Sequence, residues 1–144
     1  MERIELHNLQ DTEALAKKLA TGVTGGLLIA LSGPVGAGKT TFSKFFGAAL
    51  GVVGEMTSPT FTVMAVYELP AVINGVHRLV HIDAYRVDNA AELRAAGAED
   101  FLDDPAAVTL LEWPENVAEI LEGKDILFLR FGEENEKRFV EVTH

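Results

Sequence analysis

Residues 33–40 read Gly-Pro-Val-Gly-Ala-Gly-Lys-Thr and match the pattern G-x-x-x-x-G-K-[ST] at every fixed position. The preceding run, Leu27–Leu31, is continuously apolar, as expected of a β-strand buried on both faces. The residues from Lys39 to Leu50 predict a helix, which Gly51 ends. Between a buried strand and a helix, such a loop points successive backbone N–H groups inward, where they can bind phosphate oxygens. The stretch therefore predicts a phosphate-binding loop.

Each part of this loop has an expected role in binding a nucleoside triphosphate. The glycines allow the backbone to turn back on itself. Lys39 is expected to reach the β- and γ-phosphates, and the hydroxyl group of Thr40 to coordinate Mg²⁺. The predicted nucleotide-binding residues of the loop and of the first helical turn are Gly33, Val35, Gly36, Ala37, Gly38, Lys39, Thr40 and Thr41.

Two apolar runs further along the chain end in a carboxylate. Leu79–Asp83 ends in Asp83, and Val108–Glu112 ends in Glu112. Ligands of open α/β sheets bind at the carboxyl ends of the strands, where both acids can face the phosphate-binding loop. Mg²⁺ needs oxygen ligands beyond Thr40, and an attacking water needs an acceptor to orient it. Either acid alone fits a simple strand end equally well, but the pair favours a functional role, with the division of labour between them open.

The whole chain alternates apolar runs with helical patterns, which is typical of an α/β fold with a mostly parallel or mixed central sheet flanked by helices. No repeat or linker divides it, so residues 1–144 are expected to form a single P-loop domain. The turn signal Asn74-Gly75 predicts a hairpin. Strands are expected over 3–6, 27–31, 60–67, 77–83, 107–112, 126–131 and 138–142, and helices from residue 11 and over 39–50, 90–96 and 114–121. Residues 132–137 are expected to be a solvated turn without a function, and the acidic residues around position 100 a hydrated helix edge.

The composition excludes several classes of protein. Twelve basic and 22 acidic residues give a formal net charge of −10, which argues against a protein that binds nucleic acid or anionic lipid by itself. No apolar run reaches the ~18 residues of a membrane helix, and the first residues carry no apolar signal core. The chain contains no cysteine, and its four histidines show no metal-ligand spacing. The expected location is the cytoplasm, without a membrane partner.

Three further features invite interpretation. Ser58-Pro59-Thr60-Phe61 fits a proline turn before a strand, or a loop hydroxyl near the γ-phosphate that senses the nucleotide, for which Thr60 is the candidate. His81 alternates with Asp83 on one strand face and is expected to be packed or hydrogen-bonded. Trp113 follows Glu112 and is expected to belong to the core, or else to report on the site.

Four blocks of this sequence, in this order and spacing, resemble the bacterial TsaE (YjeE) ATPase family. They are Gly33–Thr41, Ser58–Phe61, His81–Arg86 and Leu111–Glu115. The resemblance covers nearly the whole chain, although the stretch after Gly123 carries no family motif. It implies a small P-loop fold with a mixed sheet, the cofactors ATP and Mg²⁺, and weak ATP hydrolysis.

The same resemblance implies a role for the chain in tRNA modification. A partner complex of the TsaD and TsaB type would transfer threonylcarbamoyl to adenosine-37 of tRNAs that read ANN codons, and this complex would supply the contact with tRNA. Carried over by residue, Lys39 and Thr40 match the phosphate and Mg²⁺ residues, and Asp83 and Glu112 match the acids of the family. Thr12 is a weaker match to a position near the base.

Three alternative functions remain open at the level of the sequence. A small-molecule kinase would normally bring a cluster of arginines onto the phosphates, and Arg86 is the one candidate for an internal arginine finger. A GTPase would normally carry an N-K-x-D motif, which the sequence lacks. A protein that binds the nucleotide without hydrolysing it would keep the loop alone.

Overall fold

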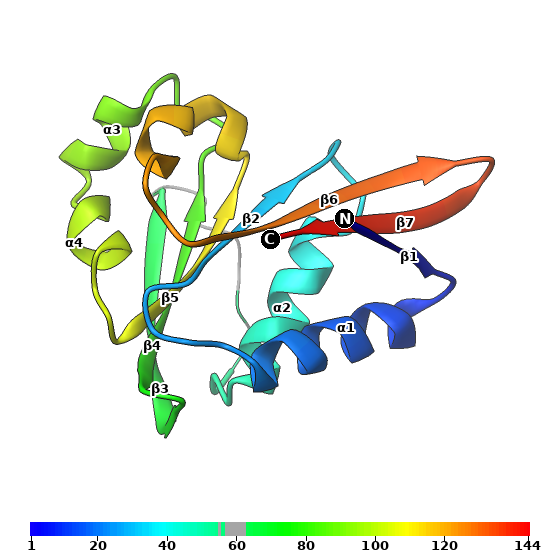
Figure 1. Cartoon of the computed structure of the whole chain (residues 1–144), viewed down its shortest axis with the longest axis horizontal. Coiled ribbons are helices and arrows are strands. Elements are labelled where there is room, and N and C mark those ends of the chain that lie inside the picture. Colours follow the sequence, from blue (N-terminus) through cyan, green and yellow to red (C-terminus); the bar gives the residue numbers. More distant parts are fainter. Residues whose placement is uncertain (55, 57–62) are drawn as a thin grey trace.

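In the residues that a computed structural model describes (1–54, 56 and 63–144), the chain forms one seven-stranded mixed sheet (Figure 1). The strand order is β1-β7-β6-β2-β5-β4-β3. The strands are β1 (Glu2–Leu6), β2 (Leu28–Ser32), β3 (Met64–Ile73), β4 (Val76–Asp83), β5 (Ala107–Glu112), β6 (Ile126–Glu134) and β7 (Lys137–Thr143). The helices are α1 (Leu9–Thr21), α2 (Lys39–Ala49), α3 (Ala90–Ala95), α4 (Ala98–Leu102) and the 3₁₀ helix η1 (Pro114–Leu121).

The centre of the sheet is parallel and its two sides are antiparallel. β2 runs parallel to both β5 and β6, and β4 runs parallel to β5. β3 pairs with β4, and β7 pairs with β6 and with β1, all in antiparallel orientation. Every residue of β5 and the first four of β2 are buried, as expected for strands covered on both faces. The sheet is therefore mixed, and the carboxyl ends of β2, β4 and β5 lie at one edge.

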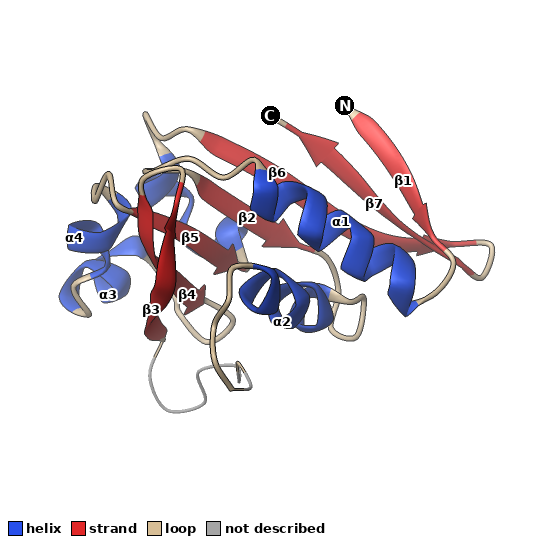
Figure 2. Ribbon diagram, turned by 90° about the horizontal axis from the view of Figure 1, so that it is seen from below, coloured by secondary structure: helices blue, strands red, loops and turns tan. Residues whose placement is uncertain are grey.

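Helices cover both faces of the parallel centre. α1 and α2 lie side by side on one face (Figure 2), where Leu15, Phe42 and Phe46 contribute to a buried apolar cluster. On the other face, Leu93 of α3 and Ile120 of η1 belong to a second buried cluster. None of the described helices combines the length and the apolar character needed to cross a lipid bilayer.

The predicted elements occur in the predicted order, with differences at their ends and one additional short helix, α4. α1 begins at Leu9, two residues before the predicted start, because the side chain of Asn8 accepts a hydrogen bond from the backbone of Asp11 and caps the helix. The terminal hairpin has a tighter turn than expected. Asn135 and Glu136 adopt positive φ values of 53° and 65°, so β6 and β7 continue to both sides of a two-residue turn.

Two other expectations can be compared with the structure in detail. Glu99 and Asp100 are exposed in the first turn of a separate short helix, α4, so the expected hydrated helix edge is confirmed there; acids are favourable at the positive end of a helix dipole. The strand expected over 60–67 is described only from Met64, as β3, and it continues to Ile73.

Candidate nucleotide-binding site

The loop between β2 and α2 has the backbone geometry of a phosphate cradle. Gly33, Gly36 and Gly38 adopt positive φ values of 132°, 83° and 114°. At Gly33 a Cβ atom would lie 2.4 Å from the carbonyl oxygen of Phe131, so the position requires glycine. α2 begins at Lys39 without a hydrogen bond from a capping side chain, and its first N–H groups are therefore suited to an anion.

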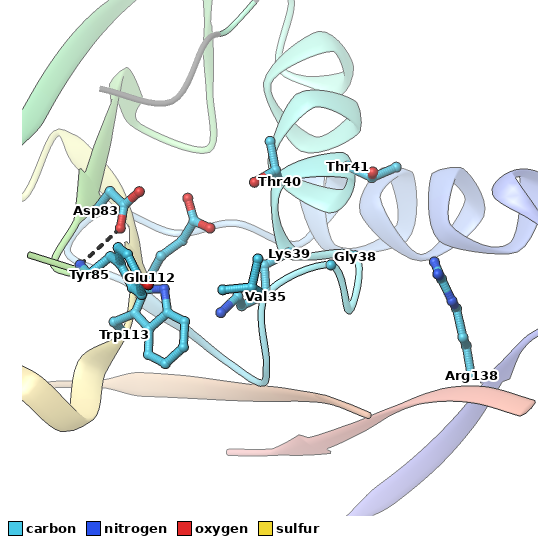
Figure 3. A pocket seen from close by; sticks show the side chains of 11 residues that line it. Val35, Gly38, Lys39, Thr40, Thr41, Asp83, Tyr85, Glu112, Trp113 and Arg138 are labelled. Atoms are coloured by element: carbon cyan, nitrogen blue, oxygen red, sulfur yellow. Dashed lines mark hydrogen bonds between the residues drawn. The ribbon is translucent and has the colours of Figure 1, made fainter. Parts of the chain in front are cut away.

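The two predicted acids lie side by side at the carboxyl ends of neighbouring strands. Asp83, the last residue of β4, is the register partner of Glu112, the last residue of β5, and Glu112 is also the register partner of Leu31 in β2. β2 leads directly into the loop, so this pairing brings both acids to it. Asp83, Glu112, Lys39 and Thr40 line one cavity of about 350 Å³, and Figure 3 shows the carboxylates and the Thr40 hydroxyl pointing toward a common space.

Glu112 is the more deeply buried of the two acids. The residue is 3% exposed, and its Oε2 atom lies 2.7 Å from Nε2 of His81. His81 is itself 1% exposed, so the prediction that it is packed or hydrogen-bonded is confirmed on both counts. A buried carboxylate needs such a partner because desolvation penalises an unpaired charge.

Asp83 is half-buried and is held by the backbone that follows it. Its Oδ1 atom accepts a hydrogen bond of 3.0 Å from the N–H group of Tyr85. Burial raises the pKa of Asp83 above its ordinary value, and the negative charge of Glu112 acts in the same direction. The hydrogen bond from Tyr85 and the positive charge of Lys39 oppose this rise.

Lys39 is held inside the loop that it follows. Its Nζ atom donates a hydrogen bond to the carbonyl oxygen of Gly33 and lies 3.7 Å from the centroid of the Trp113 ring. Burial lowers the pKa of Lys39, whereas the carboxylates of Glu112, Glu115 and Asp83 act to raise it. The ammonium group is thus close to the carboxylates and within the cradle formed by the loop.

The donor set around the cavity fits a magnesium ion bound together with phosphate. Thr40 offers a hydroxyl oxygen, and Asp83 and Glu112 offer carboxylate oxygens, which are the hard ligands that Mg²⁺ prefers. Within residues 1–54, 56 and 63–144, no group of three or more His, Asp or Glu residues could hold a metal ion on its own. Mg²⁺ commonly takes one or two carboxylates and completes its octahedron with phosphates and water.

A second cavity of about 280 Å³ adjoins the first and shares Gly38, Thr41 and Arg138 with it. Thr12, on α1, lines this second cavity and is 7% exposed. Ala37 lines it as well. The structure thus brings Thr12 from the first helix next to the loop, and its place near the base stays a prediction.

The remaining predicted residues fall into three groups. Val35, Gly36 and Thr41 line the first cavity, whereas Gly33 lines neither cavity and contributes its carbonyl group to Lys39. Thr60 lies outside the described residues, as does the rest of Ser58–Phe61. Arg86, the candidate arginine finger, is exposed and is not among the residues that line the first cavity.

Sequence reasoning did not assign two side chains of this site, Arg138 and Tyr85, and left the place of Trp113 open between the core and the site. Arg138, at the start of β7, lines both cavities, whereas the sequence left the contribution of the stretch after Gly123 open. Tyr85 and Trp113 form a wall of the first cavity, with ring centroids 5.1 Å apart (Figure 3). The available signal was the adjacency of both aromatic residues to the strand-end acids Asp83 and Glu112; for Arg138 the sequence carried no signal.

The comparisons with known proteins agree with one another. The sequence model of the family described as "Threonylcarbamoyl adenosine biosynthesis protein TsaE" matches residues 6–140. The tRNA threonylcarbamoyladenosine biosynthesis protein TsaE of Bacillus subtilis (strain 168) is 35% identical over 129 residues, which cover 88% of this chain and 77% of the relative. The protein of the same name from Streptomyces coelicolor is 40% identical over 108 residues, which cover 74% of this chain and 70% of the relative.

A solved structure extends this likeness to the fold. The crystal structure of Bacillus subtilis YdiB aligns with a TM-score of 0.70 and 27% sequence identity, over 96% of this chain and 82% of that one. The family match includes the loop, both strand-end acids and Arg138, that is, every described part of the first cavity. The chain therefore belongs to the TsaE family of threonylcarbamoyl adenosine biosynthesis proteins.

Proposed function

We propose that this chain binds ATP with Mg²⁺ in the first cavity and hydrolyses it slowly, in support of a partner complex of the TsaD and TsaB type that threonylcarbamoylates adenosine-37 of tRNA. The family supplies the role in threonylcarbamoyl adenosine biosynthesis. The observation that carries the enzymatic part is the register pairing of Asp83 with Glu112 beside the loop that contains Lys39. That pairing offers carboxylate ligands for a metal ion beside the expected position of the γ-phosphate.

Different residues of the chain bind the phosphates, bind the metal ion and orient the attacking water. The N–H groups of the loop and of the first turn of α2 hold the phosphates, and Lys39 moves from Gly33 and Trp113 to the β- and γ-phosphates. Thr40 and Glu112 would hold Mg²⁺, which when bound would supply positive charge to the phosphate oxygens. Asp83, at the edge of the same cavity, orients the attacking water.

The second cavity is the proposed position of the base. It shares Gly38 and Thr41 with the first cavity, so a nucleotide whose phosphates occupy the loop can extend into it. Thr12 provides a hydroxyl group and Leu9 provides apolar surface there. Such a site is mainly apolar with a few polar groups that fix orientation.

The charge of the chain favours tRNA contact through the partners. A net charge of −10 opposes a phosphate backbone, since non-specific affinity for nucleic acid comes from neutralising phosphates with Lys and Arg. In this proposal the partner complex holds the tRNA, and this chain supplies a nucleotide-dependent step that takes place in the cytoplasm.

Phosphate release in the presence of Mg²⁺ distinguishes this function from transfer to a small acceptor. γ-³²P-labelled ATP is incubated with the chain alone and with TsaD- and TsaB-type proteins. Slow release of free phosphate that rises with the partners supports the proposal. Label on a small acceptor would establish the alternative, a small-molecule kinase. That alternative has little support, because Arg138 is the single arginine among the described residues that line the first cavity.

A further inference from the structure

A buried contact behind the first cavity plays no part in the function proposed above. His81 lies on β4, two residues before Asp83 and therefore on the same face of the strand. Its Nε2 atom lies 2.7 Å from Oε2 of Glu112 on the neighbouring strand. Glu112 lines the cavity and His81 does not, so the histidine contacts the carboxylate from inside the protein.

The second ring nitrogen selects the tautomer of His81. Nδ1 is buried and has no hydrogen-bond partner among the residues that the structure describes. A hydrogen on Nδ1 would be buried without an acceptor, and Nε2 would then turn a lone pair toward the carboxylate of Glu112. A hydrogen on Nε2 is instead donated to Glu112 and leaves only an unpaired acceptor at Nδ1. The arrangement thus favours the tautomer in which His81 donates to Glu112.

We infer that His81 is a positioning residue, which fixes the carboxylate of Glu112 for binding a divalent cation. The inference rests on the function proposed above. A glutamate carboxylate sits beyond three rotatable bonds, and a hydrogen bond to one oxygen restricts them while the other oxygen can take a metal. Side chains that hold a metal ligand in this way typically contribute 10- to 100-fold to metal affinity or activity.

The two acids of the site differ in what holds them. Asp83 is oriented by the backbone N–H group of Tyr85, two residues further along the chain and directly after β4, and this hydrogen bond does not involve His81. Glu112 receives its hydrogen bond from a side chain. Replacing His81 is therefore expected to act through Glu112 and to leave the orientation of Asp83 intact.

Binding of Mn²⁺ to the complex of the protein with ADP tests the inference without requiring hydrolysis. Electron paramagnetic resonance measures free Mn²⁺ for the wild type, His81→Leu and His81→Gln. We expect His81→Leu to weaken Mn²⁺ binding about 10-fold or more. His81→Gln, whose amide N–H can donate to Glu112, should remain within about threefold of the wild type. Metal-free ADP affinity should stay within about twofold in both variants, since the phosphate cradle is unchanged.

A matched control separates positioning from general disruption of the core. Thr109 is a buried polar residue, 2% exposed, three positions before Glu112 on the same strand. Thr109→Val removes its hydroxyl group at similar volume and should leave Mn²⁺ binding unchanged. If His81→Leu does not fold, His81→Asn replaces it, because the shorter amide cannot span the distance to Glu112 and should weaken Mn²⁺ binding as strongly.

A double-mutant cycle links the effect to Glu112. In a Glu112→Gln background, His81→Leu should cause no further loss of Mn²⁺ affinity, because the ligand that it positions is gone. Additive losses, or equal losses in His81→Gln and His81→Leu, would overturn the positioning role. A wild-type protein that binds Mn²⁺·ADP through Glu112 but without dependence on His81 would overturn this role alone. A wild-type protein that binds neither ADP nor Mn²⁺ would overturn the proposed function and the inference together.

Discussion

The ammonium group of Lys39 lies over the indole ring of Trp113, with Nζ 3.7 Å from the ring centroid. The backbone N–H group of Trp113 donates a hydrogen bond of 3.1 Å to the carbonyl group of Leu31, on the strand that leads into the phosphate-binding loop. Trp113 is thus fixed to the same strand as the loop. Its ring holds the cation that the proposed function assigns to the phosphates, so ring and phosphates compete for Lys39.

This competition predicts that Trp113→Leu strengthens ATP binding. In the wild type, ATP must displace Lys39 from a cation–π contact worth about 0.5–1 kcal/mol. Trp113→Leu has no such contact to break, so its Kd should be about two- to fivefold lower. Isothermal titration calorimetry measures it. Phe128→Leu is the control, because Phe128 is an exposed aromatic residue of β6 that lines neither cavity; its affinity should match the wild type. Weaker binding by Trp113→Leu would show that the indole contacts the nucleotide instead.

The loop glycines predict two different costs for the same substitution. In Gly33→Ala the new Cβ atom meets the backbone of Phe131 at 2.4 Å, and φ is positive as well. In Gly36→Ala φ is positive, but no atom lies within 4 Å of the new Cβ. We expect Gly36→Ala to cost about 1 kcal/mol in the free energy of unfolding, and Gly33→Ala clearly more, about 3 kcal/mol. Urea unfolding compares them, and equal costs would contradict the steric account.

Local patterns predicted most of the parallel centre of this fold. The apolar run of β5 was predicted with its bounds, Ala107–Glu112, because a strand buried on both faces has a continuous apolar signature. The loop was predicted because its glycines, Lys39 and Thr40 form a local pattern that is specific to phosphate binding. Asp83 and Glu112 could be proposed as neighbours because parallel strands end at a common edge.

Non-local contacts could not be predicted in the same way. Arg138 reaches both cavities because β7 pairs antiparallel with β6, which itself pairs with β2. No local sequence pattern predicts this strand order. The contact of His81 with Glu112 depends on the register of two strands 31 residues apart. The antiparallel additions at both sides of the sheet likewise follow from tertiary pairing, which local propensity does not fix.

Burial of Asp83 predicts a stability change that depends on pH. The pKa of Asp83 is raised in the folded state, so the protonated carboxyl group stabilises the fold relative to the ionised one. This stabilisation is fully present below the unfolded pKa, about 3.9, and is lost as the pH rises through the folded pKa. Asp83→Asn should therefore raise Tm at pH 7, by about 2 °C because the group is only half-buried. The gain should vanish near pH 4, and the oxygen that accepts from Tyr85 is retained. Thermal unfolding followed by circular dichroism at both pH values measures this, and a lower Tm at pH 7 would contradict it.

The proposed metal role of Glu112 predicts a loss that is specific to hydrolysis. Glu112→Gln should lower the Mg²⁺-dependent rate of phosphate release by about 10-fold or more, and should change metal-free ATP affinity by less than about twofold. Glu119→Gln removes the same charge from an exposed position in η1 and is the control. Unchanged phosphate release by Glu112→Gln would remove this residue from the site.

Calorimetric titration of the chain with ATP and Mg²⁺, compared with Lys39→Ala, tests most directly whether the cradle at residues 33–40 binds a triphosphate. Lys18→Ala, which removes the same charge from an exposed position of α1, is the control. The wild type and Lys18→Ala should bind one ATP with equal affinity, and Lys39→Ala should lose at least about 10-fold in affinity. Absence of binding heat for the wild type, or equal affinity for all three proteins, would contradict the account.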